Sequence, residues 1–228
     1  MIKSVDYIKH GDCRDLLQEI PTESIDLLIT DCPYKLISGG CTGMHGMLSG
    51  KENPEIKSGG VFLHNDIKFS EWLPEVYRVL KNGTHAYIMV NGRNMAELQT
   101  EAEKCGFKFV NLLVWEKNNA IANRYYMYKC EFILLLRKGK ARTINHPGTA
   151  NVFHINNISG KKLHPAQKPE ELIRLLIENS SNVGDVILDP FMGVGTTCIV
   201  CSKINRHYIG FDIDERYFKI AEERLNNE

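Results

Sequence analysis

The sequence lacks the marks of membrane and exported proteins. None of its apolar runs approaches the roughly 18 residues of a membrane-spanning helix, and no basic segment with an apolar stretch behind it opens the chain. An excess of basic residues is also missing, since 28 Lys and Arg balance 28 Asp and Glu. Net charge therefore does not indicate a nucleic-acid partner. We expect a protein without membrane contacts that works in the cytoplasm.

A cysteine framework is missing as well. The seven cysteines are odd in number and irregularly spaced, which argues against a disulfide scaffold and favours reduced thiols. Cys198 and Cys201 form a Cys-x-x-Cys pair, but they fall inside a predicted helix and no second pair completes a zinc site. We therefore predict no metal site and expect both side chains to face the core.

Acidic residues are absent from one long stretch. Between Phe132 and Pro169 there is no Asp or Glu, whereas from Glu170 to Glu228 acids outnumber Lys and Arg by eleven to six. Such a run is either a solvated basic face or a surface that contacts phosphates. Six of its residues are our candidates for nucleic-acid contacts: Arg137, Lys138, Lys140, Arg142, Lys161 and Lys162.

With 228 residues, 43% hydrophobic and 25% charged, the chain has the size and composition of one large α/β domain. Apolar runs and helical spacing predict the elements. We expect strands over 5–9, 25–30, 84–90, 107–115, 130–137, 186–188 and 206–211, and helices over 69–80, 95–105, 170–178, 197–204 and 216–226. The strands 107–115 and 130–137 are expected to be an antiparallel pair.

Two segments outside these elements are ambiguous. The glycine-rich loop 35–60 either folds over a substrate or has no fixed structure. Tyr125, Tyr126 and Tyr128 lie between the two strands of the expected antiparallel pair. Their rings either stack on bases or pack at the edge of the sheet.

The stretch from Asp189 to Thr197, Asp-Pro-Phe-Met-Gly-Val-Gly-Thr-Thr, lies between a predicted buried strand and a predicted helix. Glycines in such a turn let the backbone approach a ligand, and the helix N-terminus favours an anionic group. Asp212 ends the next strand 17 residues after Gly195, near the offset at which an acid binds ribose hydroxyls. Cys198 replaces the third glycine of the dinucleotide fingerprint, and no P-loop lysine follows. The pattern indicates a nucleotide-type pocket of another kind.

Three further motifs accompany this loop. Asp31-Cys32-Pro33-Tyr34 follows the predicted strand 25–30, Gly11-Asp12-Cys13 follows the first strand, and residues 164–169 read His-Pro-Ala-Gln-Lys-Pro. Each alone is a common turn. Their joint occurrence with the glycine loop, in this order, resembles the DNA amino-methyltransferases, which methylate adenine N6 or cytosine N4 with S-adenosylmethionine. The tetrapeptide precedes the cofactor loop, as in the permuted order of the family's β group.

The resemblance implies a fold and a domain plan. The fold is α/β, a Rossmann-like S-adenosylmethionine-dependent methyltransferase with a mostly parallel, doubly wound sheet and an antiparallel edge hairpin. Residues 1–228 are expected to form a single domain. Its catalytic half covers about 1–138, a short target-recognition insertion about 139–163, and the cofactor-binding half about 164–228.

The resemblance also implies roles for the residues. Asp31 and the backbone carbonyl of Cys32 accept the two hydrogens of the target amino group, Pro33 holds Cys32 extended, and Tyr34 stacks on a base turned out of the duplex. The cofactor-binding residues are expected to be Asp12, Lys168, Asp189, Phe191, Gly193, Gly195, Thr196 and Asp212. Asp12 also has the position of a helix N-cap.

The expected activity is site-specific methylation of adenine N6 in DNA, as in restriction–modification. Cytosine N4 is the runner-up, because Asp at the first tetrapeptide position is only a preference for adenine. Carbon-5 methylation is rejected, since Cys32 precedes its proline whereas that chemistry uses the Pro-Cys order. A non-catalytic nucleic-acid-binding module and a methyltransferase for RNA or a protein amide are further candidates. DNA is the expected partner, and the resemblance adds a homodimer and a restriction endonuclease encoded outside this chain.

Overall fold

The computed structural model describes residues 5–34, 56–57, 61–62, 66–122, 125–160, 162–164 and 166–228. The strands are β1 (Tyr7–His10), β2 (Ile25–Asp31), β3 (Ile56–Lys57), β4 (Val61–Phe62), β5 (Leu80–Val90), β6 (Lys108–Ile121), β7 (Tyr128–Arg137), β8 (Val152–His154), β9 (Val186–Asp189) and β10 (His207–Asp212). The α-helices are α1 (Cys13–Leu16), α2 (Phe69–Val79), α3 (Met95–Cys105), α4 (Glu170–Ser180), α5 (Thr196–Lys203) and α6 (Glu215–Asn226), and a 3₁₀ turn, Leu17–Glu19, follows α1.

Eight strands form one sheet in the order β1-β10-β9-β2-β5-β7-β6-β8. The pairs from β1 to β5 are parallel, β7 is antiparallel to both β5 and β6, and β8 is parallel to β6. The predicted α/β fold with a mostly parallel sheet and an antiparallel hairpin at one side is confirmed. Because β9 and β10 lie between β1 and β2, the two halves of the sequence alternate within a single sheet.

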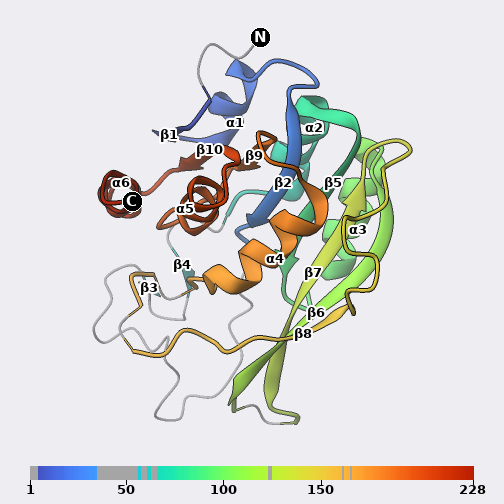
Figure 1. The fold of residues 1–228 in the computed structure, drawn as a ribbon. Coiled ribbons are helices and arrows are strands. Elements are labelled where there is room, and N and C mark those ends of the chain that lie inside the picture. The colour runs from blue at the N-terminus through green and yellow to red at the C-terminus, as the bar shows by residue number, and fades with distance from the viewer. Residues whose placement is uncertain are drawn as a thin grey trace.

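Helices cover both faces of this sheet (Figure 1). Successive residues of β2 alternate between the two cores, since Leu28 packs with α2 and α3 while Leu27 packs with α4 and α5. Trp72 is the largest side chain of the first core, and Trp115 is the largest of the second. The burial of β2 on both faces explains the apolar run from Leu27 to Ile29.

Most predicted elements agree with the structure to within a few residues. Helix α3, for example, ends where Gly106 adopts a left-handed conformation with φ 107°. The hairpin is the main difference, because β6 continues to Ile121 and β7 begins at Tyr128. Pairing with β5 stops at Phe132, so the outer part of the hairpin extends past the neighbouring strands (Figure 1).

The predicted target-recognition insertion contains one short strand. Val152–His154 forms β8, which pairs with β6 from Val114 to Glu116. Sequence analysis predicts no strand there because three residues are too short for a periodic pattern. The loop 35–60 lies outside the described residues, apart from the two-residue strand β3.

Candidate functional site

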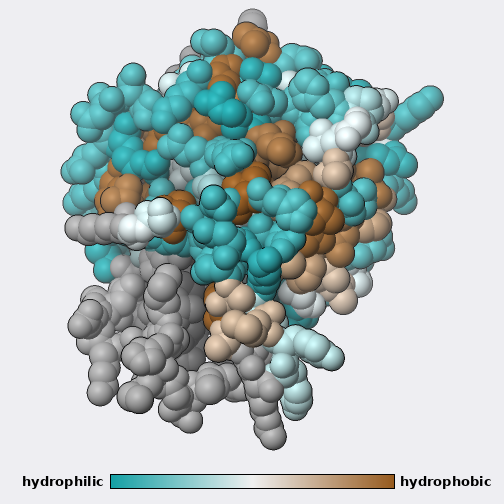
Figure 2. Space-filling view, turned by 60° about the horizontal axis from the view of Figure 1, so that its bottom comes forward, coloured by the Kyte–Doolittle hydropathy of each residue, from teal (hydrophilic) through white to brown (hydrophobic). Residues whose placement is uncertain are grey.

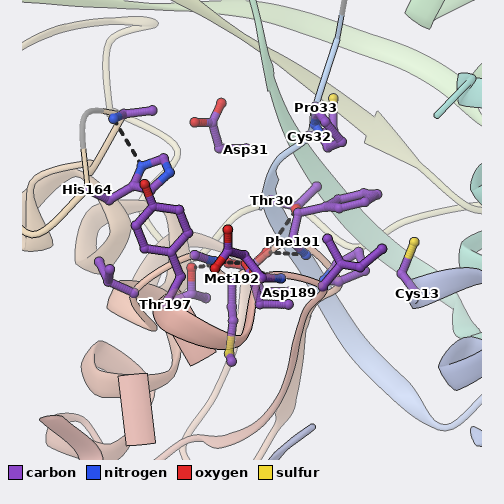
Figure 3. Close-up of a pocket in the computed structure, with 18 of the residues that line it drawn as sticks. Cys13, Thr30, Asp31, Cys32, Pro33, His164, Asp189, Phe191, Met192 and Thr197 are labelled. Carbon is purple, nitrogen blue, oxygen red and sulfur yellow. Dashed lines mark hydrogen bonds between the residues drawn. The ribbon is translucent and has the colours of Figure 1, made fainter. Parts of the chain in front are cut away.

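A cavity of about 260 Å³ opens at the edge where the parallel strands end. It is lined by the last residues of β2, β9 and β10, which are Asp31, Asp189 and Asp212. Strand order reverses between β9 and β2, and crevices at such a switch point bind ligands in open α/β sheets. In Figure 3, Asp31 and His164 lie toward one side of the cavity and Cys13 toward the other, with Asp189 and Met192 between them.

Asp31 is the last residue of β2 and lines the cavity, level with Met89 of β5. Its Oδ2 accepts a hydrogen bond from Nζ of Lys168, and the two groups form an ion pair. Burial raises the pKa of Asp31, and the Lys168 ammonium opposes this rise. The Lys168 ammonium thus lies on the Asp31 carboxylate, and Lys168 also lines the cavity, so its predicted contact with the cofactor stays a prediction.

The rest of the tetrapeptide also lines the cavity. The Cys32 side chain is buried, and its Sγ lies 3.6 Å from the carbonyl oxygen of Met89. Burial raises the pKa of this thiol well above its ordinary value. The thiol is therefore kept protonated inside the core, as expected for a residue that acts through its backbone. Tyr34 packs partly against the α2 side of the core.

Asp189 ties the glycine loop to β2. Its Oδ1 accepts from the Thr30 hydroxyl at 2.8 Å and from the Phe191 amide at 3.2 Å, and its Oδ2 accepts from the Thr197 hydroxyl at 2.6 Å. Burial raises its pKa to about 6. Phe191 lines the cavity and meets Trp72 edge-on, with 5.1 Å between ring centroids.

Asp212, at the end of β10, holds the other side of the glycine loop. Its Oδ2 accepts from the Gly193 amide and its Oδ1 from the Asp214 amide, both at 2.8 Å. Burial raises the pKa of Asp212 to about 7. Gly193 has φ +56° and open space where a side chain would stand, so the backbone there is exposed to the cavity.

The remaining predicted cofactor residues have different positions. Thr196 and Asp12 line the cavity. Asp12 is also the predicted N-cap, because its Oδ1 accepts from the Arg14 amide at 2.9 Å. Gly195 is not among the lining residues. Its φ is +76°, and a Cβ placed there would lie 2.9 Å from Cβ of Ala221 on α6. The glycine is thus needed for the approach of α6.

Gly195→Ala should lower the free energy of unfolding by about 3 kcal/mol, since the left-handed conformation and the clash with Ala221 each add a cost. Gly184→Ala is the matched control, because Gly184 has φ +84° with no neighbour within 4 Å. That variant should lose only about 1 kcal/mol. Urea unfolding of both proteins measures the difference, and equal losses would contradict the packing role of Gly195.

Most of the predicted nucleic-acid residues lie far from this site. Strand β7 is antiparallel, so its end at Arg137 lies beside His85, near the start of β5. Lys138 is buried, and its ammonium donates to the carbonyls of Tyr77 and Leu80.

The basic residues that come next after Lys138 in the chain lie at this same edge of the sheet, near the start of β5. Arg142 donates to the Ser180 carbonyl and pairs with Asp185, just before β9. Arg137, Lys138 and Arg142 therefore lie away from the cavity, and contact of the basic stretch with DNA stays a prediction. Lys161 lies outside the described residues, and Lys162 donates to Oδ1 of Asn157 at 3.0 Å.

Sequence analysis missed several residues of the site. His164 accepts from the Ala166 amide at 3.0 Å and meets the Tyr217 ring edge-on at 4.2 Å. Burial lowers its pKa to about 4, so the ring is neutral. Glu131 contacts Lys168 from β7. The histidine lies within the recognised 164–169 motif, whereas no local signal identifies Tyr217 or Glu131.

Comparison with known proteins identifies the family. The sequence profile described as DNA methylase, of the N6 and N4 type, matches residues 25–223. The chain belongs to the DNA methylase family. The type II methyltransferase M2.LlaDCHI of Lactococcus lactis subsp. cremoris is 32% identical to it over 241 residues, 95% of this chain and 88% of that protein. M2.DpnII of Streptococcus pneumoniae is 30% identical over 240 residues, 96% of this chain and 89% of that one.

Solved structures agree with this membership. The crystal structure of the M1.HpyAVI–SAM complex superposes on this DNA methylase with a TM-score of 0.70, at 25% identity, covering 96% of this chain and 98% of that one. TTHA0409 of Thermus thermophilus, a putative DNA modification methylase solved with S-adenosyl-L-methionine, gives 0.69 at 26% identity, covering 98% and 94%.

Membrane-spanning helices and metal clusters are both absent from the described residues. No helix there is long and apolar enough to cross a membrane. No group of three or more His, Cys, Asp or Glu side chains in those same segments is arranged to hold a metal ion.

Proposed function

We propose that this DNA methylase transfers a methyl group from S-adenosylmethionine to the exocyclic N6 of adenine in DNA. One observation carries the proposal: Asp31 lines the same cavity as the glycine loop and Asp212. A bound cofactor and a flipped-out base can meet there. Asp at the first position of the tetrapeptide favours adenine over cytosine in the family that the sequence resembles.

An exocyclic amino group is a poor nucleophile, because its lone pair is delocalised into the ring. Two acceptors for its hydrogens draw the nitrogen toward a tetrahedral geometry and stabilise the positive charge that develops on it. Asp31 supplies one acceptor, and the carbonyl of Cys32 supplies the other. Pro33 restricts Cys32 to an extended conformation, which fixes that carbonyl. Tyr34 stacks on the extruded base.

The residues of the cavity fit the cofactor. Gly193 exposes its backbone to open space, and Asp212 places a buried carboxylate where ribose hydroxyls can donate to it. Phe191 offers an aromatic wall, and Thr196 lies at the start of α5, near the expected site of the carboxylate. When bound, S-adenosylmethionine supplies the electrophilic methyl group.

Methyl transfer from labelled S-adenosylmethionine to unmethylated DNA, followed by nucleoside mass spectrometry, tests the proposal. N6-methyladenine is the expected product. N4-methylcytosine would retain the mechanism and overturn the assignment of the base. Label on RNA or on a protein amide, with none on DNA, would overturn the substrate.

The tip of the hairpin is the candidate for contact with DNA. Tyr125 and Tyr126 are 80% and 88% exposed, so most of each side chain is open to solvent. The hairpin extends from the edge that carries Asp31 (Figure 1). Figure 2 brings this edge forward, and hydrophobic side chains lie among hydrophilic ones in the middle of the face. We infer that the two rings stack on bases beside the extruded one.

Replacing Tyr125 and Tyr126 together by alanine should weaken DNA binding by about tenfold or more, since each stacked base contributes about 1–3 kcal/mol. The free energy of unfolding should not change, because both rings are exposed. Val183→Ala, which truncates an exposed side chain just before β9 at the opposite edge, is the control. Fluorescence anisotropy with a short duplex measures the effect. Equal affinity for the double variant and the control would move the DNA-binding surface elsewhere.

A place in restriction–modification extends the proposal, because the curated relatives are named type II methyltransferases. The homodimer, the endonuclease encoded outside this chain and the cytoplasmic location stay predictions.

A further inference from the structure

Four buried or half-buried charges of alternating sign lead from the catalytic carboxylate toward the hairpin. Lys168 Nζ bonds to Oδ2 of Asp31, and it lies 3.5 Å from Oε2 of Glu131. Oε1 of Glu131 accepts from Lys117 Nζ at 2.9 Å. The side chains of Lys168 and Lys117 are only 10% and 5% exposed. Two cations and two anions thus balance one another beside the site.

These groups come from three separate parts of the chain. Glu131 of β7 lies opposite Trp115 of β6, and Lys117 follows two residues later on the same side of β6. Lys168 lies just before α4, and its ammonium is also held by the Ala166 carbonyl at 3.1 Å. Buried charges are costly unless they are paired and hydrogen-bonded. An ion pair on the protein surface would not need to be buried and paired in this way. The burial and pairing of Lys168 therefore point to a role in fixing the position of its neighbour Asp31.

Resting on the proposed function, we infer that Lys168 is a positioning residue for Asp31. Its ammonium holds Oδ2, so that Oδ1 is presented to the target amino group, and Glu131 offsets its positive charge. Among the described residues, no hydrogen-bond partner is assigned to Oδ1 of Asp31. An amino group that becomes positively charged during methyl transfer would be opposed by an uncompensated lysine. Glu131, itself held by Lys117, removes that opposition.

The two neighbours act on Asp31 with opposite sign. Lys168 lowers the pKa of Asp31, whereas Glu131 raises it. Loss of Lys168 should therefore move the acid limb of the rate profile to higher pH, and loss of the Glu131 charge should move it to lower pH. Among the described residues, the other ionisable groups that face this cluster are Tyr34, Cys32, Asp189, Lys162 and His164.

The experiment compares Lys168→Met, Lys168→Arg and Glu131→Gln with the unaltered protein. Lys104→Met is the matched control, because it removes a lysine paired with Glu101 on the exposed face of α3. Single-turnover methylation is measured across pH, and binding of S-adenosylmethionine is measured by equilibrium dialysis. The pKa of Asp31 is measured in each protein without DNA, by ¹³C NMR of its carboxyl carbon. This last readout does not depend on which substrate is methylated.

Lys168→Met should lower the plateau rate about 100-fold, because the acceptor is no longer held in line. Its Asp31 pKa and acid limb should both rise, and Lys168→Arg should return them toward the unaltered values. Glu131→Gln should shift both downward while reducing the plateau. Lys104→Met should change neither the plateau rate nor the pKa of Asp31.

Three results would overturn the inference. One is an Asp31 pKa that does not respond to Lys168→Met or Glu131→Gln. Another is a shift of the same sign in both variants. The third is a loss of cofactor affinity in Lys168→Met that accounts for the whole loss of rate, which would return Lys168 to the cofactor site. Absence of DNA methylation by the unaltered protein would count against the proposed function alone, since the NMR titration still measures the contact between Lys168 and Asp31.

Discussion

Asp31→Ala is expected to reduce methyl transfer by about 10³-fold or more, while binding of S-adenosylmethionine stays nearly unchanged. Asp31 lines the cavity, and its carboxylate accepts from Lys168. Asp189 and Asp212 make the contacts within the loop that form the cofactor side. Removing Asp31 therefore removes an acceptor for the amino group and leaves the loop intact. Single-turnover rates and equilibrium dialysis measure the two properties separately.

Asp31→Asn gives the matched comparison, because its amide keeps the shape and one acceptor oxygen but loses the charge. Its loss of rate should be smaller than that of Asp31→Ala. The unaltered enzyme should also lose activity as the pH falls, since a protonated Asp31 is a weaker acceptor and burial raises its pKa. If Asp31→Ala lost cofactor binding together with activity, the separation of the two roles would be wrong.

Convergence of the three aspartates at one edge could be predicted from the sequence. Asp31, Asp189 and Asp212 each end a short apolar run, and the carboxyl ends of parallel strands meet at the same edge of a sheet. That reasoning needs only the period of the strands and the direction of the chain. The glycine loop could also be predicted from the sequence, because a left-handed backbone and the close approach of another element both require glycine.

The surroundings of the catalytic carboxylate could not be predicted in this way. Lys168 is 137 positions from Asp31 in sequence, and no local pattern specifies an ion pair between loops that meet only in the folded sheet. Its place in the recognised 164–169 motif suggested the cofactor instead. Glu131 looked like an ordinary charge on a strand, although its contacts with Lys168 and Lys117 balance the site.

The separation of the basic stretch from the cavity has a different cause. Strand β7 carries the chain from one end of the sheet to the other, so the basic residues that follow it lie together, away from the cavity. Glu131 lies near the carboxyl ends of the parallel strands, whereas Arg137 is beside the start of β5. The antiparallel pairing itself was predicted correctly, so the direction of β7 already implied this separation. Lys138 shows a further reason why the sequence alone is not enough. A lysine in a basic stretch can be buried and donate to backbone carbonyls instead of lying on the surface.

The affinity for S-adenosylmethionine should depend on pH through Asp212. Burial raises its pKa to about 7, and only the carboxylate form accepts strongly from ribose hydroxyls. The dissociation constant should therefore rise as the pH falls from about 8 to about 6, because protonated Asp212 has to release its proton before the cofactor binds. Asp189, with a pKa of about 6, titrates mainly below this window.

Asp212→Ala should raise the dissociation constant by about 10–100-fold at pH above 7, since hydrogen bonds to a charged group contribute about 1.5–3 kcal/mol. The variant also loses the contacts with the Gly193 and Asp214 amides, so part of the loss comes from a less ordered loop. The pH dependence separates the two effects, because the contribution of the Asp212 carboxylate changes with pH in this window, whereas a less ordered loop lowers the affinity at every pH. Asp15→Asn, an exposed acid on α1, is the control. An affinity that varies with pH as strongly in Asp212→Ala as in the unaltered protein would assign the titration to another group and leave Asp212 with the loop alone.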